Sequence, residues 1–573
     1  MNKEKHPRLR GRSLTLLWLA LFAAAFAFSL WKLPYGFGGS DEGFYLTVAH
    51  RLSLGDRLFS HEWHLSQLSS FFLLPFVKAY RALAGSNEGI MLAARVAYLV
   101  MHSLVSIVIF LRLRSFGPVA AVASALYMVF TPFDMMTLSY NTIALDMLAL
   151  TGVLLGTAEK GRGAWMAGGA CFACAVVCCP YLAAGYALFF LAVAAFSLPK
   201  LKDISGYGFF TWRNFLMFTA GILVPFFLFV VFFLRHASLP DIIENLPGLL
   251  SDPEHPSYSL WFMAKHYVYC VLTAHSLMPV VLGLYCVHLA LLFFDGKRRE
   301  HKGFHFVFAL FCSLFALVIL VPRLTEDNYN AVAFPMVFAG FSAYLLLEKK
   351  PVELFVSCFV LGIVYSVCVS STSNMGFLVI SMAFSVVNLA SLVFIGLFLA
   401  ENRGRPVPAL GAAMLLLLFA SMLVYSKANH CFWDGAPARL DSEITAGPAK
   451  GIITSPGLEE SYRLIYEDMQ SYAEAEPGRL LVMSQIPWCY LIADDYPYGS
   501  FSAWLSGLDS STVERLELYY SINPEMKPEY IHIVKSNAFG PLYLEGEAIA
   551  AGAAEHGYEL EESSVSYKLR KAP

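Results

Sequence analysis

The sequence predicts an α-helical polytopic membrane protein with about 13 transmembrane helices and a C-terminal extracytoplasmic α/β domain. Of its 573 residues, 57% are hydrophobic and only 14% are charged. A soluble domain would carry roughly a quarter charged residues. The mean hydropathy is +0.58. The apolar residues gather in long segments, whereas residues 427–573 are hydrophilic and long enough to form a core of their own.

The apolar segments begin directly after the basic N-terminus, MNKEKHPRLRGRS. About 20 apolar residues cover the roughly 30 Å of hydrocarbon in a bilayer. The first segment is longer than the core of a cleaved signal peptide, so we expect it to remain as a helix. The predicted spans are residues 14–33, 89–111, 117–133, 143–158, 164–180, 181–198, 215–234, 267–294, 304–322, 331–347, 352–370, 376–400 and 408–426.

Charge sets the orientation of these spans. Residues 65–83 are also apolar, but Pro75, Lys78 and Arg81 interrupt them. If this segment lies along the membrane interface, the N-tail and the short loops on its side hold half of the 40 Lys and Arg residues. The N-terminus is then cytoplasmic and the C-terminal domain extracytoplasmic, in the plasma membrane if the protein is bacterial.

This topology gives two domains. Residues 1–426 form the transmembrane domain, whose first outside loop, 34–88, holds interfacial helices. Residues 427–573 alternate strand-like runs (RLLVMS, EYIHIVK) with a helix-like run (LEESYRLIYEDMQSYAEA), which indicates a small α/β module. Cys431 and Cys489 lie in this part, and the sequence leaves open whether they pair.

The net charge of −3 and the lack of a basic tract give no sign of a nucleic-acid partner. The polar residues on the outside face are of more interest, because ionisable groups at membrane depth are costly and are therefore candidates for function. They include Asp41, Glu42, His61, His64, Asp134, Tyr140, Asn141, Asp146, Lys265, His266, Arg323, Glu326, Asp327 and Asn330.

Three stretches carry a resemblance to a known family. They are SDEGFYLTVAHRLSLGDRLF, GSNEGIMLAARVAYLVMHSL and YNTIALDMLAL. Together they resemble the start of GT-C glycosyltransferases, above all the branch with protein O-mannosyltransferases and lipid A aminoarabinose transferases. The matching residues are the acidic pair Asp41 and Glu42, Arg95 at the second span, and Asp146. The resemblance covers residues 10–160 well and 300–345 loosely.

The resemblance implies a transferase that takes a sugar from a polyprenyl-phosphate donor in the bilayer. The acceptor would be a glycan, a lipid or a protein. Asp41 is the expected general base of an inverting single displacement, with Glu42 and Asp146 as further catalytic candidates. Arg323, Lys265 and His266 are the expected partners of the donor phosphate.

The remaining polar residues have expected roles as well. His64, Asp134, Tyr140, Asn141 and Asn330 are expected to bind substrate. The sequence points to no certain cofactor and leaves metal dependence open. A divalent cation, Mg²⁺ or Mn²⁺, would find its ligands among Asp41, Glu42, His61 and His64.

Each of these roles has a structural alternative. Ser40 or Asp41 can cap a helix over residues 43–54, and Asp146 can begin a helix on the wet side. Arg323 can anchor a helix end. For the whole protein, the alternatives are a multi-span transporter or flippase of a lipid-linked or small polar substrate, or an inactive scaffold. The sequence shows no half-repeat, and its polar residues gather at one face, which favours the transferase.

Overall fold

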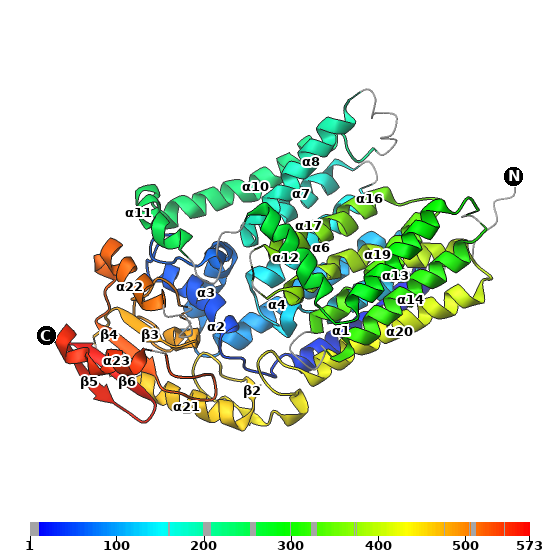
Figure 1. The fold of residues 1–573 in the computed structure, drawn as a ribbon. Helices are drawn as coiled ribbons and strands as arrows, with labels where there is room; N and C mark the ends of the chain where they lie inside the picture. Colours follow the sequence, from blue (N-terminus) through cyan, green and yellow to red (C-terminus); the bar gives the residue numbers. More distant parts are fainter. Residues whose placement is uncertain are drawn as a thin grey trace.

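Figure 1 shows the computed structural model of the chain. The structure describes residues 11–158, 161–198, 208–251, 259–297, 300–322, 329–371, 373, 375–474, 476–503, 505, 511–543 and 545–572. A bundle of long helices occupies one part of the molecule, and the C-terminal sheet with its helices lies at one end of that bundle. The starts of helices α1 and α20 lie at the opposite end.

Within the described residues, seven helical segments are long and apolar enough to cross a membrane. They are α1 (Gly11–Lys32), α4 (Ile90–Leu113), α10 (Trp212–His236), α14 (Lys302–Leu320), α16 to α17 (Val352–Ser370), α19 (Phe384–Glu401) and α20 (Pro406–Asn429). The protein is therefore an integral membrane protein.

Six shorter apolar helices complete the bundle. They are α5 (Val119–Val129), α6 (Tyr140–Gly156), α7 (Arg162–Cys178), α8 (Ala183–Phe196), α13 (Met278–Phe294) and α15 (Met336–Leu346). Each predicted span overlaps one of these long or short helices. Because the shorter ones do not span a bilayer by length alone, the number of thirteen crossings stays a prediction.

Two predicted spans are broken in the structure. The segment 267–294 does not form one helix, because α12 (Leu260–Leu272) ends before α13 begins at Met278. Pro279 stands at the start of α13, where its missing N–H costs no hydrogen bond. The segment 376–400 likewise divides into α18 (Phe377–Met382) and α19.

Residues 34–88 form a helical cap over one end of the bundle. It contains α2 (Asp41–Ser53), the short 3₁₀ helix η1 (Leu65–Ser69) and α3 (Ser70–Ala84). The 15 residues of α3 extend about 22 Å, which is too short to cross the hydrocarbon. At its end, Leu83 is 90% exposed. An interfacial position for α3, as predicted from the charges, fits both features.

The C-terminal region folds around a four-stranded sheet with the order β3-β4-β6-β5. Its strands are β3 (Leu480–Met483), β4 (Tyr530–Val534), β5 (Tyr558–Glu562) and β6 (Ser566–Lys571). Strands β3 and β4 are parallel, so a crossover is needed, and it includes α22 (Ser511–Ile522). The other two pairs are antiparallel. Helices α21 (Pro456–Met469) and α23 (Gly546–Ala551) and the short strands β1 (Ser442–Glu443) and β2 (Ile453–Thr454) complete the predicted α/β module.

The C-terminal region is joined to the 34–88 cap by backbone hydrogen bonds. The Gly36 N–H donates to the Ile453 carbonyl over 2.8 Å, and the Trp63 N–H donates to the Phe501 carbonyl over 2.7 Å. Helix α2 lies so close to Trp488 that a Cβ on Gly43 would come within 2.9 Å of it. The cap and the C-terminal region therefore form one continuous packed structure.

A buried arginine lies at the centre of this junction. The Arg51 guanidinium donates to Asp56 (2.8 Å) and to Glu62 (2.7 Å) within the cap. It also donates to the carbonyl of Ser500 (2.9 Å) and lies 5.1 Å from the ring centre of Tyr498, both in the C-terminal region. Arg51 and Glu62 are completely buried. The Arg51 side chain thus connects two segments more than 400 residues apart.

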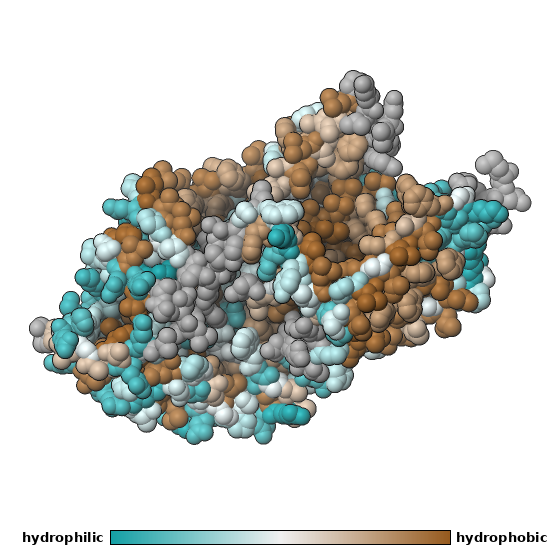
Figure 2. Space-filling model, viewed as in Figure 1, coloured by the Kyte–Doolittle hydropathy of each residue, from teal (hydrophilic) through white to brown (hydrophobic). Residues whose placement is uncertain are grey.

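The polarity of the surface differs between the helix bundle and its two ends. In Figure 2, hydrophobic residues cover the helix bundle, and hydrophilic residues cover the C-terminal region and the opposite tip. Exposed aromatic residues stand at both ends of the bundle, where aromatic belts meet lipid headgroups. Trp31, Tyr425 and Trp433 lie near the C-terminal region, and Trp212, Phe293 and Phe294 lie near the other end.

Candidate functional site

The acidic pair of the cap begins helix α2, and its two members have different surroundings. Asp41 Oδ1 accepts a hydrogen bond from the Tyr45 hydroxyl (3.2 Å), and Oδ2 accepts one from the Ser40 hydroxyl (3.3 Å). Tyr45 lies four residues further on, which on a helix places it over the same face. Ser40 is the N-cap of α2, but its side chain makes no capping hydrogen bond.

The carboxylate of Asp41 is suited to accept a proton. Burial raises the pKa of Asp41 to about 6, while the hydrogen bonds from Tyr45 and Ser40 act in the opposite direction. At pH 7 the group is therefore mostly ionised, yet it is more basic than an ordinary aspartate. A pKa close to the working pH is what general-base catalysis requires.

Asp41 does not stand alone at this position. The ring of Tyr140, at the start of α6, meets the Tyr45 ring edge-on at 5.5 Å. The Asn141 side chain hydrogen bonds to Tyr140. The structure thus brings three of the predicted site residues, Asp41, Tyr140 and Asn141, to the contact between α2 and α6. Tyr45, which links them, was missed in the sequence, although its spacing of four from Asp41 indicates the contact.

A testable consequence concerns the pH dependence of a reaction that uses Asp41 as its base. The rate is expected to fall as the pH drops below about 6, because the carboxylate becomes protonated. The Tyr45→Phe variant loses a hydrogen bond that stabilises the charged form, so the pKa of Asp41 rises. Its acid limb should move to higher pH in a kcat/KM profile. An unchanged or lower limb would contradict the role of Tyr45.

Glu42 is an ion-pair residue in this structure. Its carboxylate receives both Arg95 Nε (3.0 Å) and Arg95 Nη2 (2.5 Å), and both side chains are buried. Arg95 also donates to the carbonyls of Leu33 and Gly36. The pair therefore fixes the turn between α1 and α2. In this structure Glu42 thus positions the start of α2, and with it Asp41.

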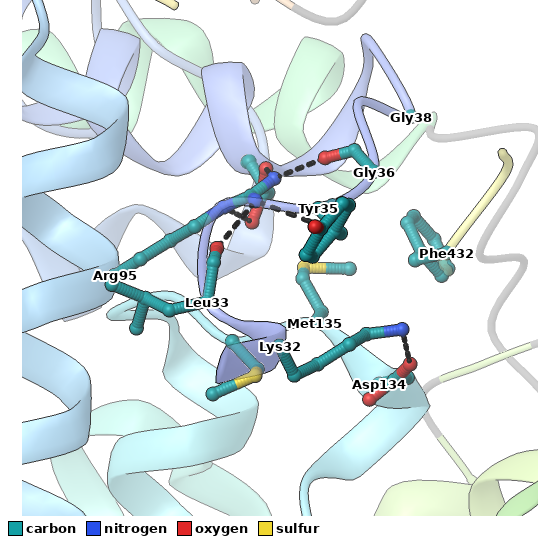
Figure 3. A pocket seen from close by; sticks show the side chains of 11 residues that line it. Lys32, Leu33, Tyr35, Gly36, Gly38, Arg95, Asp134, Met135 and Phe432 are labelled. Carbon is teal, nitrogen blue, oxygen red and sulfur yellow. Dashed lines mark hydrogen bonds and ion pairs between the residues drawn. The ribbon is translucent and has the colours of Figure 1, made fainter. Parts of the chain in front are cut away.

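A second ion pair lies across a small cavity from the first, as Figure 3 shows. Lys32 Nζ lies 3.0 Å from the Asp134 carboxylate, and both side chains are buried. Lys32 also hydrogen bonds to the His430 carbonyl. The cavity between the two pairs measures about 20 Å³, enough for a water molecule and not for a sugar.

The turn that carries Asp134 is strained. Phe133 and Asp134 have φ values of 58° and 56°, which non-glycine residues rarely adopt. The Phe133 N–H donates to Asn330 Oδ1 over 3.0 Å, so Asn330 holds this turn in place. Asp134 and Asn330, both predicted to bind substrate, are thus brought together through the backbone of one turn. The turn also lies on the cavity of Figure 3, since Asp134 and Met135 line it.

Asp146 lies within the helix bundle, with partners that come from α4 and α5 and not from α2. Its Oδ1 atom is 2.8 Å from His102 Nδ1 and accepts a 2.8 Å hydrogen bond from the Tyr127 hydroxyl. The other imidazole nitrogen of His102 faces the Tyr127 carbonyl at 2.9 Å. Since a carbonyl can only accept, His102 donates there. Asp146 is thus engaged by two side chains.

The histidines predicted as metal ligands have separate partners. His61 Nδ1 lies 3.3 Å from Asp56. His64 Nδ1 accepts a hydrogen bond from the Ser66 N–H (3.1 Å) and so caps η1. In the described part of the chain, no group of three or more His, Cys, Asp or Glu side chains is arranged to hold a metal ion. Asp41, Glu42, His61 and His64 are thus not gathered into one cluster in the described residues.

Of the three residues expected to bind the donor phosphate, two lie among the described residues. Lys265 and His266 lie on α12, which begins seven residues before the predicted span 267–294. Lys265 is exposed, and His266 Nε2 approaches Cys270 Sγ at 3.4 Å, one helical turn further on. Arg323 lies outside the described residues, as do Glu326 and Asp327. Cys431 and Cys489 are both free thiols.

The fold and the site define an integral membrane protein whose extramembrane cap presents a carboxylate of raised pKa beside the helix bundle. No protein-family model matches the chain, and no curated protein matches it. Among solved structures, it is similar to ArnT from Cupriavidus metallidurans bound to undecaprenyl phosphate. The two share 12% sequence identity over 98% of each chain, with a TM-score of 0.42.

Proposed function

We propose that this protein is a membrane glycosyltransferase of the GT-C class, which moves a sugar from a polyprenyl-phosphate donor to an extracytoplasmic glycan, lipid or protein. The observation that carries the proposal is the Asp41 carboxylate, held by Tyr45 and Ser40 with a pKa of about 6 at the start of α2. The resemblance of residues 10–160 to GT-C enzymes supports the same class.

The steps of the proposed reaction follow from the chemistry of the acceptor hydroxyl, the Asp41 carboxylate and the phosphate leaving group. The acceptor hydroxyl oxygen attacks the anomeric carbon as Asp41 takes the hydroxyl proton. The bond from that carbon to the phosphate oxygen breaks, and the lipid phosphate leaves with the electron pair. A phosphate leaving group is already anionic and needs no acid. A single displacement of this kind inverts the anomeric configuration.

Cations are needed where the phosphate leaves. We propose Arg323, with Lys265 and His266 behind it, as its partners, since guanidinium groups bind phosphate through two parallel hydrogen bonds. Lys265 and His266 lie on α12. The proposed reaction has no step through a divalent cation, because the residues predicted to bind one are engaged separately.

The proposal includes an orientation. The N-terminal tail is basic, as are the short connections such as DGKRREHKG before α14 and ENRGRP before α20. By the positive-inside rule this end of the bundle is cytoplasmic. The cap, Asp41 and the C-terminal region would then face the extracytoplasmic side, where a lipid-linked donor and an outer acceptor can meet.

The test is transfer by the full-length protein in proteoliposomes. Radiolabelled polyprenyl-phosphate sugars are supplied as a panel, with cell-envelope lipid, glycan and protein fractions as acceptors. We expect label in an acceptor from at least one polyprenyl-phosphate sugar, with inverted configuration, and none from nucleotide sugars. No transfer from any donor, together with movement of the labelled lipid across the bilayer, would instead support the flippase alternative.

A further inference from the structure

Helix α11 (Leu239–Leu250) has two faces of different character. It follows α10 after only two residues, Ala237 and Ser238. None of its residues takes part in the proposed reaction. In Figure 1 it lies between the end of α10 and the C-terminal region.

One face of α11 packs against the cap and the C-terminal region. The Trp63 indole N–H donates to Asn245 Oδ1 (2.9 Å), and the Asn523 side-chain amide donates to the same atom (2.8 Å). Arg515 donates to the Gly248 carbonyl (3.1 Å). The absence of a side chain at Gly248 is required here, since a Cβ would come within 2.2 Å of the Trp63 ring. This face therefore holds the cap and the C-terminal region together.

The other face is an apolar stripe exposed to solvent. Leu239, Ile243, Leu246 and Leu250 are 68%, 64%, 45% and 73% exposed. Their spacing of four, three and four residues places all of them on one side of the helix. A continuous row of exposed apolar side chains in an otherwise well-packed region marks a contact surface for a membrane or for another protein.

The position of α11 indicates that its apolar stripe contacts lipid. It continues directly from α10, whose side chains Phe227 and Leu234 are 66% and 71% exposed on the membrane-facing surface. Figure 2 shows the hydrophobic surface of α10 continuing over α11. The interfacial helix α3 meets the same end of α10, because its Phe71 ring packs against Phe232 at 5.4 Å. The stripe thus extends the lipid-facing surface at the level of the headgroups.

We propose that α11 lies in the outer headgroup layer of the bilayer with this stripe in the lipid, and that it thereby anchors the C-terminal region to the membrane surface. Amphipathic helices with one large apolar face bind lipid in this way. The helix carries acidic residues, Asp241 and Glu244, and no Lys or Arg, so the attraction is apolar and a zwitterionic lipid suffices. The inference goes beyond the transferase proposal and stands whichever reaction the protein performs.

The test is photo-crosslinking of the full-length protein in vesicles of radiolabelled phosphatidylcholine. The photoreactive amino acid p-benzoylphenylalanine replaces Ile243 in one variant and Leu246 in a second. The control replaces Leu560, an apolar residue of β5 in the C-terminal region that is 45% exposed, as Leu246 is. All three positions are exposed, so folding should be unaffected.

Lipid label is expected on the Ile243 and Leu246 variants at a level at least tenfold above the Leu560 control. A crosslinked dimer from these two positions would show that a second copy covers the stripe, and would overturn the proposal. Equal labelling of all three positions, or no lipid adduct at Ile243 and Leu246, would overturn it as well.

Discussion

Replacing Asp41 by Asn is expected to lower kcat for sugar transfer by about 10²- to 10⁴-fold, the usual contribution of a general base. Asparagine has nearly the shape of aspartate, so the contacts around α2 are kept, but its amide cannot take the acceptor proton. Binding of the donor should remain. The measurements are single-turnover transfer from the active donor and, separately, donor binding to the same membranes.

The loss of activity must be separated from a loss of folding. Burial raises the folded-state pKa of Asp41 above its ordinary value, so at pH 7 the ionised group makes the folded state less stable than a neutral group would. Asp41→Asn should consequently unfold at no lower temperature than the wild type at pH 7. Full activity in this variant would remove Asp41 from the chemistry.

The second large effect concerns stability. In the Arg51→Met variant, Asp56 and Glu62 lose the guanidinium that both of them bind, and they remain buried. Removing one side of a buried ion pair costs about 3–5 kcal/mol, because charge is left without compensation. We expect a clear drop in the unfolding temperature of the purified protein in detergent. The chain should also be cleaved faster by protease within the cap and within the C-terminal region, where the two pack together.

Arg57, also in the cap, provides a matched control. It pairs with Asp241 at 2.6 Å, but its side chain is 53% exposed. Exposed ion pairs contribute about 0–1 kcal/mol, so Arg57→Met should leave the unfolding temperature almost unchanged. If both variants lowered it equally, the burial of the Arg51 cluster would not be what stabilises the junction.

The helical elements were the most predictable part of the fold. The apolar segments are long and contain few charges, so composition alone located the helices, and the cations in residues 65–83 set α3 apart from the predicted spans. The boundaries near α12 were missed because only Thr273, His275 and Ser276 interrupt the otherwise apolar stretch around the break, and a predicted span can include a few such polar residues. Pro279 was the local signal for the new start, and apolar periodicity obscured it.

The candidate site was predictable only in part. The position of Asp41 after the first span and its family resemblance located it, and the spacing of four residues would have identified Tyr45. Ion pairing was not predictable, because the partner of Glu42 is Arg95, 53 residues away, and the partners of Asp146 are on two other helices. Asp41 and Glu42 are adjacent in the sequence, yet tertiary contacts give them different environments. Asp41 accepts hydrogen bonds from hydroxyl groups, whereas Glu42 forms an ion pair with Arg95. The contact of α2 with the C-terminal region left no trace in local sequence.

The hydrogen bonds between the cap and the C-terminal region also constrain the order in which the chain can fold. Gly36 finds its acceptor at Ile453, and Trp63 finds its acceptor at Phe501. Both donors emerge early in synthesis, and both acceptors emerge among the last quarter of the residues. Contacts of such long sequence separation form slowly. The cap must therefore stay incompletely paired until the C-terminal region has been synthesised.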